Sequence, residues 1–304
     1  MEIERLRALS KQQFLSGYVG QNRPVVVSDA LDGWRLQEVW TPEYLAHLLG
    51  KQVVQVYNSC FDLLCLIPLE KYFEKHFGNS AELSGVVPYV RWYTKLRDID
   101  DDFPWGDRVF DVIRQNWGAP YFVPDTDYVL PWSPSPAKVD PASHSFPARG
   151  LFVSGRGAKT GLHCDPWGSD AILCQLYGAK TWLMYAPDQA TWLTNGSAVV
   201  DPDQPDLRRF PFFGEAVSTY EFTIGPGDAV YIPHGWYHHV RTDTDSISLT
   251  WNFVHATTRG KFTEWLKGKI SDIDASVLRF FFASSLGPKA VPAEIEELVR
   301  KTYG

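Results

Sequence analysis

The sequence predicts a mainly β protein with added helices, in which an antiparallel barrel or sandwich lies between an α+β N-terminal portion and C-terminal helices. Short apolar runs follow one another closely through residues 148–256, and turns rich in Gly, Pro and Asp separate them. Helical patterns occur on both sides of this region. The 304 residues are 44% hydrophobic and 14% aromatic, which is ample for a substantial packed core and argues against a disordered chain.

The N-terminal portion, residues 1–147, alternates helix and strand patterns over its first half. Thr41 is a suitable N-cap for one helix, with Pro42 at the first helical position and Gly50 after the last turn. The elements expected here are, in order, a helix over 11–18, a strand over 23–29, a helix over 41–49, a strand over 52–57 and a helix over 68–77. Residues 89–147 are rich in Pro, Asp and Trp and predict loops that wrap a larger core.

Eight short strands are expected in residues 148–256. They are predicted over 150–154, 161–165, 171–177, 180–186, 219–224, 229–232, 237–241 and 246–254. A long insertion, residues 187–217, separates the fourth and fifth of these strands, and loops longer than about 12 to 15 residues in a compact domain are commonly functional. We hypothesise that this insertion borders a substrate entrance. The alternative is a surface insertion that covers the barrel edge.

The last portion, residues 257–304, returns to helical patterns. Helices are expected over 262–270, 273–282 and 292–301, and none of them carries chemistry of its own. Packing or self-association is therefore their expected role. The whole chain is expected to form one barrel-centred domain.

The charge balance and the cysteines indicate the cellular context. There are 36 acidic and 29 basic residues, for a net charge of -7, and no Lys/Arg block occurs, so neither nucleic acid nor an anionic membrane is an expected partner. The four cysteines show no CxxC spacing, and two lie in apolar runs that predict reduced core thiols. No apolar run approaches the ~20 residues that span a bilayer, and the N-terminus has no signal-peptide core. A soluble, cytoplasmic protein is expected.

The pair His163 and Asp165 is the sharpest candidate for a functional site. Residues i and i+2 of a strand point to the same face, so an imidazole and a carboxylate lie side by side. They supply two members of a 2-His-1-carboxylate metal site, and a distant strand must supply the third. The candidates for this third ligand are His234, His238, His239 and His255. His238 is favoured because it shares a strand face with Val240, whereas His239 shares one with Arg241; His239 and then His234 follow.

Three polar residues lie in otherwise apolar strands near these histidines. Lys180 begins one strand, while Thr250 and Asn252 alternate with large apolar residues in another. A lysine buried there without an anionic partner would cost several kcal/mol. A dicarboxylate cosubstrate would supply that partner, whereas the alternative is a lysine whose ammonium reaches solvent at the strand end.

Three segments together resemble the Jumonji C family of Fe(II)- and 2-oxoglutarate-dependent oxygenases, within the cupin superfamily. They are TGLHCDPWG at 160–168, which continues to QLYGAKTW at 175–182, then GPGDAVYIPHGWYH at 225–238, and SLTWNF at 248–253. The first is most similar to the lysyl-hydroxylase branch. The resemblance covers most of the chain and implies a double-stranded β-helix, or jelly-roll, core.

The resemblance also implies roles for individual residues. It implies that His163, Asp165 and His238 hold Fe(II), and that Lys180 pairs with the distal carboxylate of 2-oxoglutarate. Hydroxyl and amide partners of that cosubstrate would be Thr160, Thr250 and Asn252. The branch often has an Asn on the strand after the first histidine, but residues 171–174 are apolar here. Another contact must replace it, and Tyr121 is proposed for that role.

The activity implied is hydroxylation of a C–H bond, with O2 as the second cosubstrate and succinate and CO2 as products. A protein or peptide side chain is the leading substrate class, followed by a free amino acid or other small metabolite, and then by N-demethylation. A cupin that holds metal but only binds a ligand is the alternative from another class. A homodimer through the C-terminal helices is expected from the resemblance.

Overall fold

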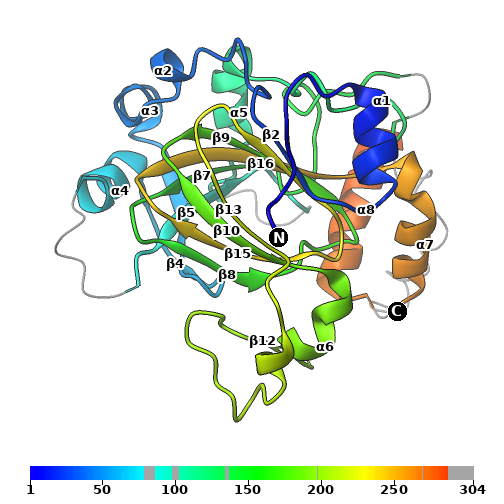
Figure 1. Ribbon diagram of the computed structural model, residues 1–304. Helices are drawn as coiled ribbons and strands as arrows, with labels where there is room; N and C mark the ends of the chain where they lie inside the picture. Colours follow the sequence, from blue (N-terminus) through cyan, green and yellow to red (C-terminus); the bar gives the residue numbers. More distant parts are fainter. Residues whose placement is uncertain (79–85, 98–102, 134–136, 197, 269, 287–304) are drawn as a thin grey trace.

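The computed structural model describes residues 1–78, 86–97, 103–133, 137–196, 198–268 and 270–286. Two facing sheets form its centre, and helices lie around them (Figure 1). The strands of the ten-stranded sheet are, in spatial order, β1 (Arg5–Leu6), β2 (Val25–Val27), β14 (Ala229–Ile232), β9 (Asp170–Tyr177), β16 (Ser246–His255), β7 (Gly150–Ser154), β5 (Tyr89–Tyr93), β3 (Val53–Tyr57) and β4 (Leu63–Pro68), with β6 (Tyr128–Leu130) paired to β16.

The four-stranded sheet lies against the first and consists of β13 (Tyr220–Ile224), β10 (Lys180–Tyr185), β15 (Tyr237–Thr242) and β8 (Lys159–His163), in this order. All eight strands expected in residues 148–256 are present, with ends that differ by at most two residues from those expected. The mainly β fold with a jelly-roll core and added helices is therefore confirmed.

Successive side chains of the ten-stranded sheet pack into two different cores, one on each face of the sheet. On β9, Leu173 belongs to the core between the two sheets, together with Trp182 of β10. Its neighbours Ile172 and Cys174 belong to a larger core on the other face of the sheet. Strand β9 is consequently buried on both faces, which explains why its sequence is an almost continuous apolar run.

Helices of the N-terminal portion cover that outer core: α1 (Lys11–Phe14), α2 (Leu36–Val39), α3 (Pro42–Leu49), α4 (Leu69–His76) and α5 (Asp107–Ile113). Helix α3 begins as expected, because the Thr41 hydroxyl accepts a hydrogen bond from the Tyr44 N–H at 3.2 Å and Pro42 follows the cap. The helix expected over 11–18 differs, since α1 ends early and a π-helical turn, Leu15–Val19, continues it.

The prediction of loops over residues 89–147 was wrong in part. Strands β5 and β6 and helix α5 form within this region. Strand β5 pairs with β7 and β3, so long-range pairing stabilises a five-residue strand that lies among loop-forming residues. As a result, the N-terminal portion and the barrel share one continuous sheet.

Two C-terminal helices, α7 (Arg259–Lys267) and α8 (Asp272–Leu286), pack in a separate apolar cluster beside the barrel. Phe262 of α7 and Phe281 of α8 contribute to it, as does Trp167 from the loop after β8. The helix expected over 292–301 lies outside the described residues. Within the residues described, none of the helices is long and apolar enough to cross a membrane.

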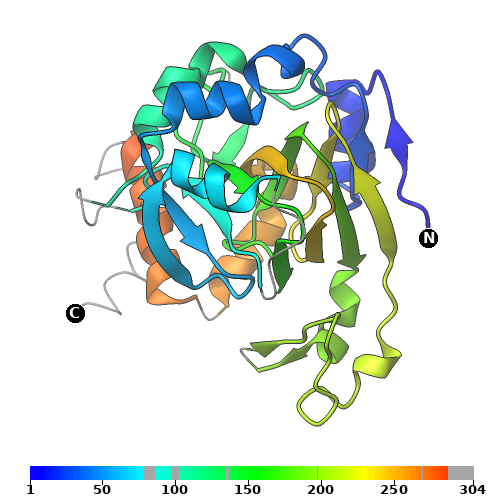
Figure 2. The same ribbon diagram turned by 90° about the vertical axis from the view of Figure 1, so that its left-hand side faces the viewer.

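The insertion, residues 187–217, projects from one end of the barrel (Figures 1 and 2). It contains α6 (Ala190–Leu193), β11 (Thr194–Asn195) and β12 (Ala198–Val199). Its Leu193 and Phe210 share a small apolar cluster with Leu162 of β8 and Tyr185 of β10. Asp203 also forms ion pairs with this part of the small sheet.

The four cysteines are free thiols. Cys174 is buried, as expected for a core thiol, whereas Cys60 and Cys65 are exposed. Cys65 lies in an apolar run, but that run forms β4, which ends the ten-stranded sheet and leaves Leu63, Leu64 and Leu66 about half exposed.

Candidate metal centre

Two histidines lie directly opposite each other on neighbouring strands of the four-stranded sheet. His163 ends β8, His238 is the second residue of β15, and the two are register partners. Asp165 reaches the site from the loop after β8, because the strand expected over 161–165 ends at His163. Ligand atoms of these three residues all lie within 4.8 Å of one another. Among the described residues, they form the one such group that could hold a metal ion, and their composition is that of a 2-His-1-carboxylate site.

A β-bulge determines which side chains of β8 face this site. The register shifts after the pair His163 and His238, so that two residues of β8, Gly161 and Leu162, oppose one residue of β15. The extra residue lets Thr160 and His163 line the same cavity although they are three positions apart. Strict alternation would have turned one of them away.

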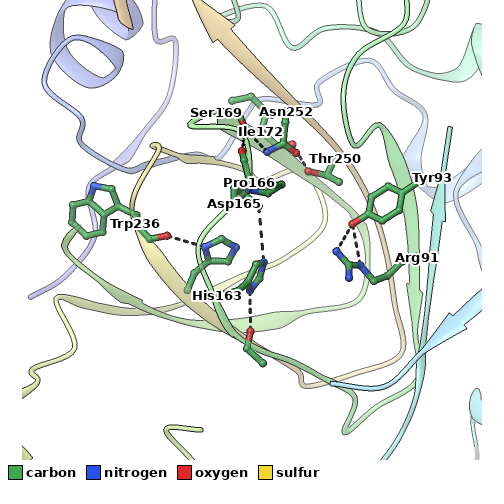
Figure 3. Close-up of polar contacts among 12 residues, drawn as sticks. Arg91, Tyr93, His163, Asp165, Pro166, Ser169, Ile172, Trp236, Thr250 and Asn252 are labelled. Atoms are coloured by element: carbon green, nitrogen blue, oxygen red, sulfur yellow. Dashed lines mark hydrogen bonds and ion pairs between the residues drawn. The ribbon is translucent and has the colours of Figure 1, made fainter. Parts of the chain in front are cut away.

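Gly161 is required at the bulge because another segment approaches it closely. A Cβ atom at this position would lie 2.6 Å from the backbone oxygen of Ser59, which already accepts a hydrogen bond from the Gly161 N–H at 2.9 Å. The carbonyl oxygen of Gly161 lies 2.9 Å from His163 Nδ1, and that of Trp236 lies 3.2 Å from His238 Nδ1 (Figure 3). A carbonyl only accepts, so each Nδ1 carries the hydrogen and each Nε2 is free to bind a metal.

Burial shifts the pKa values of His163 and Asp165. Desolvation lowers the pKa of His163 well below its usual value, and the nearby His238 lowers it further, so this imidazole stays neutral. Desolvation raises the pKa of Asp165, an effect opposed by His238, Arg91 and the Asn252 amide. Asp165 Oδ2 is buried and has no hydrogen-bond partner among the described residues. A divalent cation would satisfy that oxygen, so the three residues fit Fe(II).

The other candidate histidines lie elsewhere. His239 points to the opposite face of β15, where its Nε2 lies 3.3 Å from Asp203. His234 Nδ1 lies 3.5 Å from Asp170, and the His255 Nδ1 contacts Thr257 at 2.8 Å. The structure thus brings His238, the favoured candidate, to His163 and Asp165.

The metal centre opens onto a cavity of about 220 Å³ between the two sheets. Residues lining it include Arg91, Tyr93, Phe152, Thr160, Leu173, Lys180, Trp182, Ile232, Thr250 and Asn252, in addition to the three candidate ligands. The Lys180 side chain is 4% exposed, and its Nζ donates to the Ser248 hydroxyl at 3.0 Å. Among the described residues no carboxylate lies within ion-pair distance of it, and desolvation lowers its pKa to about 7. A carboxylate of 2-oxoglutarate would provide the missing partner.

The other residues predicted to bind the cosubstrate, Thr160, Thr250 and Asn252, line the cavity, and their hydrogen-bond partners differ. Thr160 borders it from β8. The Thr250 hydroxyl donates to the Ile172 carbonyl at 2.9 Å, so towards the cavity this hydroxyl can only accept. Asn252 Nδ2 donates to the Ser169 hydroxyl at 2.9 Å (Figure 3). Because the Asn252 amide also borders Asp165, it is placed to orient the carboxylate of the metal site.

The structure does not bring Tyr121 to this cavity. Its hydroxyl donates to Asp29 at 2.5 Å and accepts from the Leu9 N–H at 3.2 Å, and the side chain is 43% exposed. Tyr121 packs edge-to-face against Phe122 in the N-terminal portion. The prediction rested on a gap in the resemblance and not on a contact, and the residue lies at the surface of the N-terminal portion.

Two residues that the sequence did not suggest line the cavity from β5. Arg91 and Tyr93 alternate with the buried Val90 and Trp92, so both point towards the metal centre (Figure 3). An arginine between strongly β-forming residues carries the same signal as Lys180, namely a charge in an apolar strand. This signal was missed because the surrounding segment, rich in Pro and Asp, predicted loops instead of a strand.

Comparisons with known proteins agree with this geometry. The chain matches the cupin-like domain family over residues 11–259. It is 26% identical to the arginine-specific demethylase JMJ20 of Arabidopsis thaliana, over 84% of the chain and 58% of that protein. It is 22% identical to the 2-oxoglutarate and iron-dependent oxygenase JMJD4 of Gallus gallus, over 83% of the chain and 60% of that protein. For the human tRNA wybutosine-synthesizing protein 5, the identity is 24%, over 84% of the chain and 78% of that protein.

The match covers most of the chain but only part of several relatives. The chain spans less than two thirds of the length of both Arabidopsis arginine-specific demethylases, JMJ20 and JMJ22, and of the chicken oxygenase. The similarity is to Jumonji C proteins in general, so the closeness to the lysyl-hydroxylase branch stays a prediction. With the fold, the three candidate ligands and the matched range in agreement, the chain belongs to the cupin-like domain family, and its resemblance to Jumonji C oxygenases is confirmed.

Proposed function

We propose that this protein is an Fe(II)- and 2-oxoglutarate-dependent oxygenase that hydroxylates a C–H bond of a protein or peptide side chain. One observation carries the proposal: a single cavity holds the three candidate metal ligands and a buried lysine that lacks a carboxylate partner among the described residues. Relatives that are named as iron- and 2-oxoglutarate-dependent oxygenases or as demethylases support the same class.

Each residue has a distinct task in this proposal. His163, Asp165 and His238 would hold Fe(II), to which 2-oxoglutarate and O2 would bind as cosubstrates. The metal and its cosubstrates supply the oxidative chemistry, in which 2-oxoglutarate is converted to succinate and CO2 while oxygen is inserted into the substrate. Lys180 binds the distal carboxylate of 2-oxoglutarate, with Thr160 beside it. The hydrogen bonds of both Nδ1 atoms keep the imidazoles fixed before the metal binds.

Aromatic side chains keep water away from the reacting bond. Trp182 stacks on the His238 ring with centroids 5.6 Å apart, and Phe61 packs edge-to-face on His163 at 4.7 Å. Phe152 lies beside Lys180, whose Nζ is 5.8 Å from the ring centroid. A dry environment strengthens the electrostatic interactions of the bound acid and protects the oxidant from side reactions.

N-demethylation is the second candidate outcome, and the names of relatives such as the Arabidopsis demethylase favour including it. The two outcomes share the metal site, because demethylation by this chemistry begins with hydroxylation of an N-methyl group. They differ in the product, which gains an oxygen atom in one case and loses a methyl group in the other.

The test is succinate release from 2-oxoglutarate by the Fe(II)-loaded protein, followed by mass spectrometry against a panel of peptides and metabolites. We expect succinate formation that depends on Fe(II) and a product that gains one oxygen atom on a peptide. Absence of turnover in the loaded protein would contradict the proposal and favour a binding module. A demethylated product would support the same class of oxygenase but with N-demethylation as its reaction.

A further inference from the structure

Arg91 presents a second cation to the cavity of the metal centre. Its Cζ atom lies 4.5 Å from the Phe61 ring centroid, 5.0 Å from that of Tyr93 and 5.5 Å from that of Tyr57. The guanidinium is therefore held among aromatic rings, which restrict its orientation and replace part of its hydration. In Figure 3, Arg91 and Trp236 lie on opposite sides of His163, and the guanidinium of Arg91 points towards the candidate metal ligands.

The hydrogen bonds of Arg91 leave part of its donor capacity unused. Nε donates to the Tyr93 hydroxyl at 2.9 Å, and Nη2 contacts the same oxygen. Among the described residues, Nη1 has no hydrogen-bond partner, and no carboxylate lies within ion-pair distance. Arg149 offers a contrast, since its Nη1 donates to two backbone carbonyls at 2.9 and 2.8 Å and it does not line the cavity. Arg149 also has a buried Nε without a hydrogen-bond partner, but it is bound to the backbone away from the cavity, whereas Arg91 presents its free donor where a ligand can reach it.

The charges of the proposed catalytic complex leave Arg91 without a counterion. The two charges of Fe(II) and the one of Lys180 balance Asp165 and the two carboxylates of 2-oxoglutarate. The described residues lining the cavity include no other carboxylate. A buried cation that stays unpaired is costly, so a further anion beside Arg91 would stabilise the complex.

We propose that Arg91 binds a carboxylate of the substrate that is oxidised. This inference rests on the proposed function and narrows its substrate to molecules with an acid group near the target C–H bond, such as an acidic side chain, the terminal carboxylate of a peptide or a free amino acid. A planar guanidinium matches a carboxylate with two parallel hydrogen bonds, and Nη1 is the donor still available for one of them. Tyr93 holds the opposite edge of the guanidinium and so acts as a positioning residue.

The experiment measures binding without turnover. The 304-residue chain is loaded with Mn(II) and N-oxalylglycine, an unreactive analogue of 2-oxoglutarate, and titrated by calorimetry with the amino acids, their N-acetyl derivatives and the matched carboxamides. We expect at least one acid to bind about tenfold or more tightly than its amide, because the amide loses a charge-assisted pair. Arg91→Gln should remove that preference and leave the affinity for N-oxalylglycine within about twofold. Arg91→Lys should restore only part of it, because an ammonium lacks the planar fork.

Arg241→Gln is the matched control, since Arg241 lies on β15 outside the cavity and pairs with Glu221, and it should change none of these affinities. Equal binding of acids and amides, or no binding of any acid in the panel, would overturn the inference while leaving the proposed function intact. A large loss of N-oxalylglycine affinity in Arg91→Gln would overturn it too, by assigning Arg91 to the cosubstrate. If the wild-type protein bound neither Mn(II) nor N-oxalylglycine, the proposed function would fail and the inference with it.

Discussion

The two sheets form opposite walls of one cavity and contribute to it differently. The four-stranded wall supplies His163, His238 and Lys180, which are the groups proposed to hold the metal and the cosubstrate. The ten-stranded wall supplies Arg91 and Asn252, which lie beside those groups and orient or complement them. Three of the residues proposed to hold the metal and the cosubstrate thus lie on one small sheet.

This division has a structural basis. The bulge in β8 and the direct pairing of β8 with β15 fix the two imidazoles relative to each other. The ten-stranded wall is instead assembled from strands of both the N-terminal portion and the barrel, and β5 is not paired with either strand that carries a candidate histidine ligand.

The largest effect is expected on the four-stranded wall itself. His163→Ala, Asp165→Ala or His238→Ala should lower 2-oxoglutarate turnover by more than about 100-fold and weaken Fe(II) binding, because each removes one of three ligands. Succinate assays and calorimetry with the metal would measure both. His239→Ala is the control on the neighbouring position, since that side chain faces the insertion. Full activity in any of the three variants would remove that residue from the ligand set.

A second substitution addresses the bulge. In Gly161→Ala the added methyl group would meet the Ser59 carbonyl at 2.6 Å, so one of the two segments must move, and the carbonyl that orients His163 moves with it. We expect turnover to fall by about 10- to 100-fold, together with a lower affinity for Fe(II). Gly214→Ala has open space around its Cβ and should behave as wild type. An unchanged metal affinity in Gly161→Ala would show that the bulge does not fix the site.

Replacing Lys180 should weaken cosubstrate binding but stabilise the metal-free protein. Lys180→Met should raise the apparent KM for 2-oxoglutarate by about tenfold or more, because the carboxylate loses its charge partner. In the metal-free protein it should raise the free energy of unfolding by about 1–4 kcal/mol at pH 7, since a buried unpaired ammonium is removed. Denaturant titration and steady-state kinetics measure the two effects, with the exposed Lys138→Met as control.

The stability gain from Lys180→Met should depend on pH. The pKa of Lys180 is lowered from 10.5 to about 7 in the folded protein, so between these values the unfolded state binds more protons than the folded state. Wild-type stability therefore rises with pH over this window, and the advantage of the variant shrinks. An advantage that stays constant from pH 7 to 10.5 would mean that the ammonium is not desolvated.

The smallest effect is expected on the outer face of the four-stranded sheet. Asp203 pairs with Lys159 and lies 3.3 Å from His239, and no described residue of the insertion lines the cavity. Burial raises the pKa of Asp203, but Lys159, His239 and Arg241 together outweigh this effect and lower the pKa from its usual value, so the stabilising effect of Asp203 is present at neutral pH and lost in acid. Asp203→Asn should cost about 1 kcal/mol and change turnover less than about twofold. A large loss of turnover would instead support a role of the insertion at the substrate entrance.

The sequence predicted the four-stranded wall far better than the wall opposite. His163, His238 and Lys180 lie in short motifs whose spacing is local, and the strands that carry them repeat at regular intervals. Arg91 lies in a strand that exists because β3 and β7 pair with it, and such pairing cannot be seen in five residues. The prediction for Tyr121 failed for a related reason. The sequence alone does not show which loop reaches a cavity.

The buried ammonium group of Lys180 also affects how the protein would release its product. Succinate keeps the carboxylate that this lysine is proposed to bind, so after each cycle the spent acid competes with the next molecule of cosubstrate for one ammonium group. We expect competitive inhibition by succinate, which at saturating concentrations depends on the ratio of the two acids. In a cell, this ratio would tie the output of the protein to central carbon metabolism, and in the laboratory succinate and similar dicarboxylate buffers would reduce the measured rates.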